Sequence, residues 1–164
     1  MPIRQAIKED LASMVAIHNQ AISRGLLTGH TEPLTVESQT SWFASHQSER
    51  YPLFVEEEAG TVRGWCSLSP YRSGRGAMSI TAEITYYVDF NYHRQGIGRR
   101  LVDYAIEAST RLGFKNLLAI VLETNVASVD LLKIFGFTVW ARLPDIAEFD
   151  GKEVSHIYLG KRIF

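Results

Sequence analysis

Several features that mark common protein classes are scarce in this sequence. Its 164 residues include a single cysteine, Cys66, so the chain can form neither an internal disulfide nor a cysteine metal cluster. With 17 basic and 18 acidic residues the formal charge is −1, which gives no global electrostatic attraction for nucleic acid or an anionic membrane. No apolar run approaches the roughly 20 residues of a membrane span, and the first residues lack the apolar core of a signal peptide. We therefore expect a cytosolic protein with no nucleic-acid or membrane partner.

Metal-ligand spacing is also missing. The histidines His18, His30, His46 and His156 do not form the closely spaced sets that bind a metal ion, so we expect no metal site. Cys66 lies in an apolar alternating segment, which favours a buried structural thiol over a nucleophile.

The hydrophobic periodicity of the chain predicts a single domain over residues 1–164, of the α/β (α+β) class, with helices on both sides of a sheet. A chain of this length can bury about two-thirds of its unfolded surface in one core. Helices are expected over residues 10–23, 35–48, 97–112 and 125–135. Strands are expected over residues 3–6, 53–57, 62–68, 84–88, 116–122, 137–143 and 154–159.

Three segments carry further expectations. Residues 116–122 form a continuous apolar run, which is typical of a strand covered on both faces. The consecutive acidic residues Glu56, Glu57 and Glu58 are most simply the solvated end of a hairpin. Residues 69–80 form a long polar connection, and loops of this length inside a compact domain are often functional.

The most informative stretch is residues 81–101, which predicts a strand, a glycine-containing turn and the beginning of a helix. Unpaired backbone N–H groups and the positive end of a helix dipole meet at such a point, so it suits a phosphate group. A dinucleotide-binding motif is disfavoured because its third glycine position is Leu101. A P-loop is excluded because no Gly-Lys-Ser/Thr follows the turn.

The turn His93-Arg94-Gln95-Gly96-Ile97-Gly98 is followed about 30 residues later by Asn125-Val126-Ala127-Ser128-Val129-Asp130-Leu131 and then by Gly136-Phe137. In order and spacing these segments resemble the two signature segments of the GNAT N-acetyltransferases. The resemblance implies a central mixed, mostly antiparallel twisted sheet, acetyl-CoA as co-substrate, and a pyrophosphate held by main-chain N–H groups of the turn.

Within that family the sequence is most similar to the phosphinothricin or methionine sulfoximine acetyltransferases. The similarity lies in Thr31-Glu32-Pro33-Leu34-Thr35, in Arg50-Tyr51-Pro52 and in Thr81-Ala82-Glu83. Members of this group acetylate the free amino group of small amino-acid-like molecules. The resemblance also implies a homodimer.

A direct transfer to an amine needs a base, because an α-amino group with a pKa of about 8 is mostly protonated at neutral pH. Glu83 is the candidate catalytic base, and Arg72 and Arg75 are the candidates for binding a substrate carboxylate. The candidate cofactor-binding residues are Tyr87, Val88, His93, Arg94, Gln95, Gly96, Ile97, Gly98, Arg99, Asn125 and Ser128.

The sequence departs from the family pattern in the acceptor region and at the expected acid. Gly29 and Met78 stand where the group usually has aromatic residues, and Leu132 stands where many relatives have a tyrosine that protonates the leaving thiolate. Two alternatives therefore stay open. One is acetylation of a protein N-terminus, a polyamine or an antibiotic amine, and the other is a CoA-binding sensor without turnover.

Overall fold

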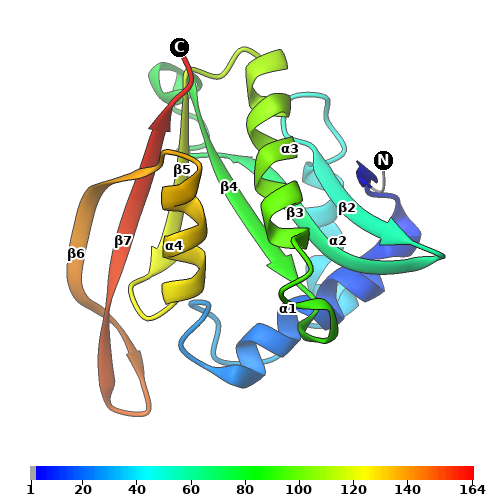
Figure 1. Cartoon of the computed structure of the whole chain (residues 1–164), viewed down its shortest axis with the longest axis horizontal. Coiled ribbons are helices and arrows are strands. Elements are labelled where there is room, and N and C mark those ends of the chain that lie inside the picture. Colours follow the sequence, from blue (N-terminus) through cyan, green and yellow to red (C-terminus); the bar gives the residue numbers. More distant parts are fainter. Residues whose placement is uncertain (1–2) are drawn as a thin grey trace.

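A computed structural model describes residues 3–164, and it contains a seven-stranded sheet covered by helices on both faces (Figure 1). The strands are β1 (Ile3–Gln5), β2 (Leu53–Glu58), β3 (Thr61–Pro70), β4 (Thr81–Val88), β5 (Asn116–Leu122), β6 (Thr138–Phe149) and β7 (Lys152–Arg162). The helices are α1 (Leu11–Arg24), α2 (Val36–Ser45), α3 (Ile97–Arg111) and α4 (Val126–Ile134), with short 3₁₀ helices at Lys8–Asp10, Gly76–Met78 and Phe90–Tyr92.

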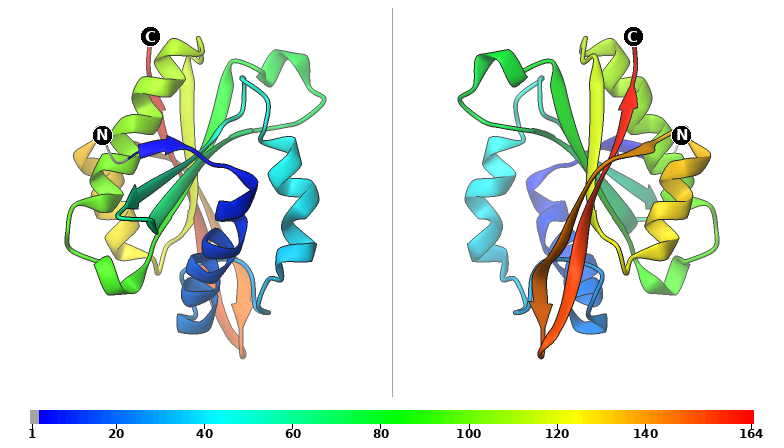
Figure 2. Two further views of the ribbon diagram at one scale, coloured as in Figure 1. Left: turned by 90° about the vertical axis from the view of Figure 1, so that its right-hand side faces the viewer. Right: turned by 90° about the vertical axis from the view of Figure 1, so that its left-hand side faces the viewer.

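The strand order is β1-β2-β3-β4-β5-β7-β6, and every neighbouring pair is antiparallel except β4 with β5. Figure 2 shows α1 and α2 on one face of the sheet and α3 and α4 on the other. The expected mixed, mostly antiparallel sheet between two helical layers is thereby confirmed.

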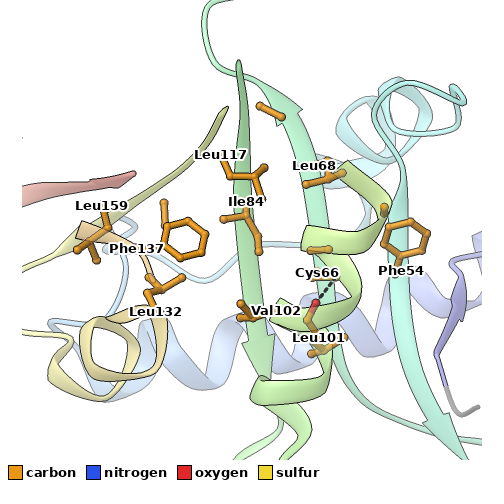
Figure 3. Packing of buried hydrophobic residues seen from close by; sticks show 14 of the residues in the cluster. Phe54, Cys66, Leu68, Ile84, Leu101, Val102, Leu117, Leu132, Phe137 and Leu159 are labelled. Atoms are coloured by element: carbon orange, nitrogen blue, oxygen red, sulfur yellow. Dashed lines mark hydrogen bonds between the residues drawn. The ribbon is translucent and has the colours of Figure 1, made fainter. Parts of the chain in front are cut away.

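Each face of the sheet has its own apolar core. Under α3 and α4 the buried side chains include Cys66, Leu101, Phe114 and Phe137, part of which is drawn in Figure 3. The thiol of Cys66 is fully buried, and its Sγ lies 3.8 Å from the carbonyl oxygen of Leu101. A buried structural thiol was the expectation, and it is confirmed. The second core lies under α1 and α2 and consists of Ala6, Leu11, Met14, Val15, Ile17, Phe43, Leu53, Val55 and Trp65.

Several element boundaries differ from the sequence-based expectation. Helix α2 ends at Ser45 and not near residue 48, because the next residues make tighter i→i+3 hydrogen bonds, as in His46 N–H to Phe43 C=O at 3.1 Å. Strand β6 runs to Phe149 and not to residue 143. It is an edge strand with most side chains exposed, so its sequence carries little of the alternation that reveals a strand, and pairing with β7 extends it past an irregularity at residues 143–147.

The expectation that residues 56–58 form one solvated acidic end is wrong for Glu56. This residue is only 2% exposed, and its carboxylate accepts hydrogen bonds from Arg100 Nη2 at 2.5 Å and Arg100 Nε at 3.1 Å. The physical reason is that the regular pairing of β2 with β3 continues through Glu56, so alternation places this side chain on the same face as Phe54, beneath α3. A run of identical charges does not reveal which of its members lies on the covered face of a strand.

The two parallel strands separate shortly after they begin. Strands β4 and β5 pair only at Thr81 with Asn116, Ala82 with Leu117 and Glu83 with Leu118. Beyond Glu83 they diverge, as the lower half of Figure 1 shows. Main-chain N–H and C=O groups on the β5 side of residues 84–88 therefore lack a neighbouring strand to pair with.

Helix α3 lies very close to strand β3, and Gly64 permits this contact. A Cβ atom at position 64 would lie 3.0 Å from Ile97 Cγ2, 3.0 Å from Leu101 Cδ1 and 3.1 Å from the carbonyl oxygen of Tyr87. We expect Gly64→Ala to lower the free energy of unfolding by about 1–2 kcal/mol, because either the helix or its core side chains must move. Urea unfolding would measure this loss. Gly76→Ala is the matched control, since nothing lies within 4 Å of a Cβ there, and equal stabilities of the two variants would contradict the prediction.

Candidate active site

A cavity of about 90 Å³ lies where β4 and β5 diverge. Its walls come from both strands, from the loop after α1, and from the beginning of α4. The lining residues are Leu27, Thr28, Gly29, Ile84, Thr85, Tyr86, Tyr87, Ile120, Val121, Leu122, Asn125, Ser128 and His156. Ile120 and Val121 are only half-buried, so the expectation that residues 116–122 are covered on both faces fails where the strand borders the cavity.

Strand β4 sends its side chains alternately to the two helical layers. Tyr87 faces α1, where its ring stacks on His18 with centroids 4.2 Å apart. Tyr86 faces α4, and its hydroxyl lies 2.5 Å from Ser128 Oγ. Burial raises the pKa of Tyr86 to about 12, although the hydrogen bond with Ser128 opposes part of this shift. By the same alternation Glu83 shares the α1 and α2 side with Tyr87.

Glu83 lies on the last paired position before the strands separate. Its side chain is half-buried, and this burial raises the pKa of the carboxyl above its usual value. Burial is also the main reason that the pKa of Tyr87 is raised, and the nearby charge of Glu83 adds to it. Glu83 is not among the residues that line the cavity, but it directly precedes Ile84, which is. A half-buried carboxyl with a raised pKa is a better proton acceptor than an ordinary glutamate.

The glycine turn after β4 leaves backbone donors free at the beginning of α3. Gly96 has φ +78°, a left-handed conformation that favours glycine, and no side chain caps the helix. The N–H groups of the first turn therefore have no side-chain hydrogen-bond partner, and they lie at the positive end of the helix dipole. His93 lies beside the turn, and its Nε2 is 3.0 Å from the carbonyl oxygen of Val88.

Three arginines surround this turn, and they have different surroundings. Arg94 and Arg99 are exposed. Arg100 is held by Glu56 and by the carbonyl oxygen of Gln95, which accepts from Nη1 at 3.1 Å. Sequence reasoning favoured Arg94 and Arg99 as phosphate ligands and was neutral on Arg100. The contacts of Arg100 indicate a structural role.

The beginning of α4 is attached to the loop above the cavity. Asn125 caps the helix, with its side-chain oxygen 3.4 Å from the Ser128 N–H, and its amide group donates to the carbonyl oxygen of Leu27 at 3.4 Å. Thr124 Oγ1 donates to the carbonyl oxygen of Leu26 at 2.6 Å. These bonds hold the loop that contributes Leu27, Thr28 and Gly29 to the wall of the cavity.

Arg72 and Arg75 are exposed and do not line this cavity. They lie in a second, wider cavity of about 390 Å³ formed by the connection between β3 and β4. Aromatic side chains join the two cavities, because Tyr71 makes an edge contact with Tyr158, and Tyr158 makes one with His156. The two arginines therefore line the wider cavity and not the cavity between β4 and β5, and Glu83 is among the lining residues of neither.

Leu132 is fully buried and packs beside Phe137 and Leu159 in the core (Figure 3). It has neither the chemistry nor the exposure to donate a proton. The structure instead brings the hydroxyl groups of Tyr86 and Ser128 into the cavity wall. Sequence reasoning named Ser128 but missed Tyr86, although strict alternation along residues 83–88 would have separated it from Glu83 and directed it towards α4.

Two structural features of residues 3–164 bear on other functions. Among residues 3–164, no cluster of three or more His, Cys, Asp or Glu side chains is arranged to hold a metal ion. Within the same residues, every helix is too short or too polar to cross a membrane.

A parallel strand pair that separates beside a glycine turn and an uncapped helix beginning defines an acetyltransferase of the GNAT class. The model of the acetyltransferase (GNAT) family matches residues 19–137, and the chain belongs to this family. It is a transferase.

Individual relatives narrow the comparison. The chain is 37% identical to YwnH of Bacillus subtilis (strain 168), which carries a provisional phosphinothricin acetyltransferase name, over 99% of both chains. It is 32% identical to the L-methionine sulfoximine/L-methionine sulfone acetyltransferase of Salmonella typhimurium, over 89% of this chain and 85% of the relative. The structure of yncA from Salmonella typhimurium, solved with its cofactor acetyl-CoA, matches with a TM-score of 0.91 and 28% identity over 99% of this chain and 93% of that one.

Proposed function

We propose that the protein transfers the acetyl group of acetyl-CoA to the amino group of a small amino-acid-like molecule of the phosphinothricin or methionine sulfoximine/sulfone type. The observation that carries this proposal is the position of Glu83. A half-buried carboxyl with a raised pKa stands at the last position where β4 and β5 pair, one residue before Ile84, which lines the cavity between the strands. The names of the relatives support the acceptor class.

The residues around the glycine turn fit acetyl-CoA as the co-substrate. Free N–H groups at the beginning of α3 suit a pyrophosphate, and Gly96 and Gly98 let it approach the main chain closely. The exposed guanidinium groups of Arg94 and Arg99 suit further phosphate oxygens. His93, Gln95 and Ile97 complete the turn. Asn125 and Ser128 would border the pantetheine arm, since both line the cavity between the strands.

Each step of a direct transfer then has a candidate group in this chain. Acetyl-CoA supplies the thioester whose carbonyl carbon the amine attacks. Glu83 removes a proton from the acceptor ammonium, directly or through one water. A main-chain N–H near Tyr87 and Val88, on the edge of β4 that β5 leaves open, polarises the carbonyl. The hydroxyl of Tyr86 or of Ser128, or a water, protonates the departing thiolate, because Leu132 cannot.

The exposed arginines of the β3–β4 connection support an acceptor that carries a carboxylate. A guanidinium group can bind a carboxylate through two parallel hydrogen bonds. Arg72 and Arg75 line the wider cavity, and the contacting side chains of Tyr71, Tyr158 and His156 lie between it and the cavity that separates β4 from β5. We infer that the acceptor lies across this connection, with its amine at Glu83 and its carboxylate towards the arginines.

Thiol release from acetyl-CoA, measured over a panel of acceptors, tests the proposal. The panel contains methionine sulfoximine, methionine sulfone, phosphinothricin, common amino acids, polyamines and short peptides. We expect turnover to be fastest with the first three, because only these combine a free α-amine, a carboxylate and a tetrahedral polar side-chain end. Preference for polyamines or peptides would overturn the acceptor class. Binding of CoA without turnover on any acceptor would overturn catalysis and favour a sensor.

The homodimer implied by the family resemblance stays a prediction, and the surface of β6 supports it. This edge strand exposes about half of the side chains of Val139, Trp140 and Ile146. Apolar side chains along an unpaired edge are a favourable surface for a second copy of the chain.

A further inference from the structure

His46 is a buried histidine that the proposed transfer does not use. It follows the last residue of α2 and is only 5% exposed. Its Nδ1 lies 2.9 Å from the carbonyl oxygen of Trp42, and its Nε2 lies 2.8 Å from Ser69 Oγ. Both ring nitrogens therefore have hydrogen-bond partners inside the protein.

These two partners determine the tautomer of the ring. The carbonyl oxygen of Trp42 can only accept, and Ser45 Oγ, which lies 3.2 Å from the same nitrogen, donates its own hydrogen to that carbonyl at 2.7 Å, so Nδ1 must carry the hydrogen. Burial lowers the pKa of His46 below its usual value, which favours the neutral ring. A neutral ring protonated on Nδ1 has a lone pair on Nε2, and the Ser69 hydroxyl must then donate its hydrogen to it.

Ser69 is the direct neighbour of Glu83 across the antiparallel pair of β3 and β4. Residues in register on such a pair point to the same face, with Cβ atoms about 4.5–5.5 Å apart. Because the only hydrogen of the Ser69 hydroxyl is committed to His46, the side that faces Glu83 offers lone pairs alone. An ionised carboxylate cannot form a hydrogen bond with lone pairs, and in the structure the hydroxyl of Ser69 is bonded to His46 and not to Glu83.

We propose that His46 is a positioning residue for the transfer: by accepting the Ser69 hydroxyl hydrogen, it makes Ser69 an acceptor for the proton that Glu83 takes from the substrate amine. The proposal rests on the function proposed above. When Glu83 becomes a carboxylic acid, its O–H can donate to Ser69 Oγ, and no bond of Ser69 or His46 has to break. His46 and Ser69 thus stabilise the protonated form of Glu83 and increase its proton affinity.

The other groups around Glu83 should not mask a change in its pKa caused by Ser69 and His46. Tyr87 on the same strand is a neutral phenol near physiological pH, and Leu118 across the parallel pair is apolar. Arg72 and Arg75 are exposed on the loop that connects β3 with β4. Burial raises the pKa of Glu83. His18 of α1 stacks on Tyr87 of the same face, and burial lowers its pKa to about 4, so this ring is neutral in the pH range of the test.

The test compares the pH dependence of kcat/KM in four variants with one acceptor, so that titration of the amine contributes equally. In His46→Leu the Ser69 hydroxyl is free to rotate and donate to the Glu83 carboxylate. The acidic limb, which is the fall of kcat/KM at low pH, should then shift to lower pH by about one unit. Ser69→Ala removes the acceptor without supplying a donor, so it should shift the acidic limb to lower pH by less than His46→Leu does. The double variant should match Ser69→Ala, because His46 acts through Ser69. His46→Gln, whose amide oxygen can accept from Ser69, should restore the wild-type limb.

Two further measurements separate this proposal from other outcomes. Titration of the Glu83 carboxyl by ¹³C NMR needs no turnover, so it tests the proposal even if no acceptor is found. Ser67→Ala is the matched control, because Ser67 lies two residues along the same face of β3, opposite Thr85, and should leave both the limb and the titration unchanged. Folded His46→Leu and Ser69→Ala proteins with an unshifted Glu83 titration, or additive shifts in the double variant, would overturn the proposal.

Discussion

Glu83→Gln is expected to lower kcat/KM by about 10²–10³ at neutral pH. The substitution keeps the size and polarity of the side chain but removes its ability to take a proton, and a well-placed base contributes about 10²–10⁴ in rate. Stopped or continuous thiol-release assays with the best acceptor of the panel would measure the loss. Because Glu83 is half-buried at the end of the paired part of β4, the amide should be accommodated without unfolding.

The pH dependence gives this prediction a second readout. Burial raises the pKa of Glu83, so the wild-type rate should begin to fall, as pH decreases, at a higher pH than for an ordinary glutamate. The Gln variant should lack this limb. The loss of kcat/KM in the Gln variant should become smaller as the pH rises towards the pKa of the acceptor amine. An amine that is already neutral needs no base. Glu107→Gln, an exposed change on α3, serves as the control, and near-wild-type kcat/KM for Glu83→Gln at every pH would exclude the assigned role.

Arg100→Met is expected to destabilise the protein by about 3 kcal/mol, with little direct effect on the chemistry. Removing the guanidinium leaves the Glu56 carboxylate, which is 3% exposed, as an uncompensated buried charge. Breaking a buried pair in this way costs about 3–5 kcal/mol, and the lower end applies here because the Arg100 side chain is 44% exposed to water. For a chain of this size, a loss of this magnitude corresponds to about 6–12 °C in Tm. The hydrogen bond with Glu56 also raises the pKa of Arg100, consistent with a strongly paired cation.

The neighbouring arginine provides a matched control. Arg99 is exposed beside the same turn, so Arg99→Met should leave Tm nearly unchanged and raise the KM for acetyl-CoA. The double variant Glu56→Leu/Arg100→Met should recover most of the stability, since it removes both charges. If Arg100→Met retained the wild-type Tm while losing acetyl-CoA affinity, Arg100 would be a phosphate ligand and the structural assignment would be wrong.

Most of the architecture could be predicted from the chain because local patterns carry it. Apolar periodicity located all four helices, and Gly25 ended α1 and Thr35 capped α2 as their residue types indicate. The long edge strand β6 was underestimated because its side chains face solvent and show no clear alternation. Its extent depends on pairing with β7, which is a contact between segments and not a property of either one.

The residues of the candidate site also fall into a part that the sequence could predict and a part that it could not. The residues of the glycine turn are contiguous in the chain, so their grouping around one anion could be inferred from the sequence. Tyr86, His46 and the hydroxyl of Ser69 could not be assigned, because their importance lies in contacts with α4, α2 and β4 that form only when distant segments pack. The roles of Arg72 and Arg75 depend on the path of a long loop, which composition does not determine.

By itself, the sequence determined the family, the order of helices and strands, and the turn with its free backbone donors, since each is encoded by residues close together in the chain. Only the tertiary structure decided which charges are buried and where the two parallel strands separate. It also decided which hydroxyl groups line the resulting cavity. These properties depend on strand register and on packing between layers, so one residue of offset changes the face on which a side chain lies.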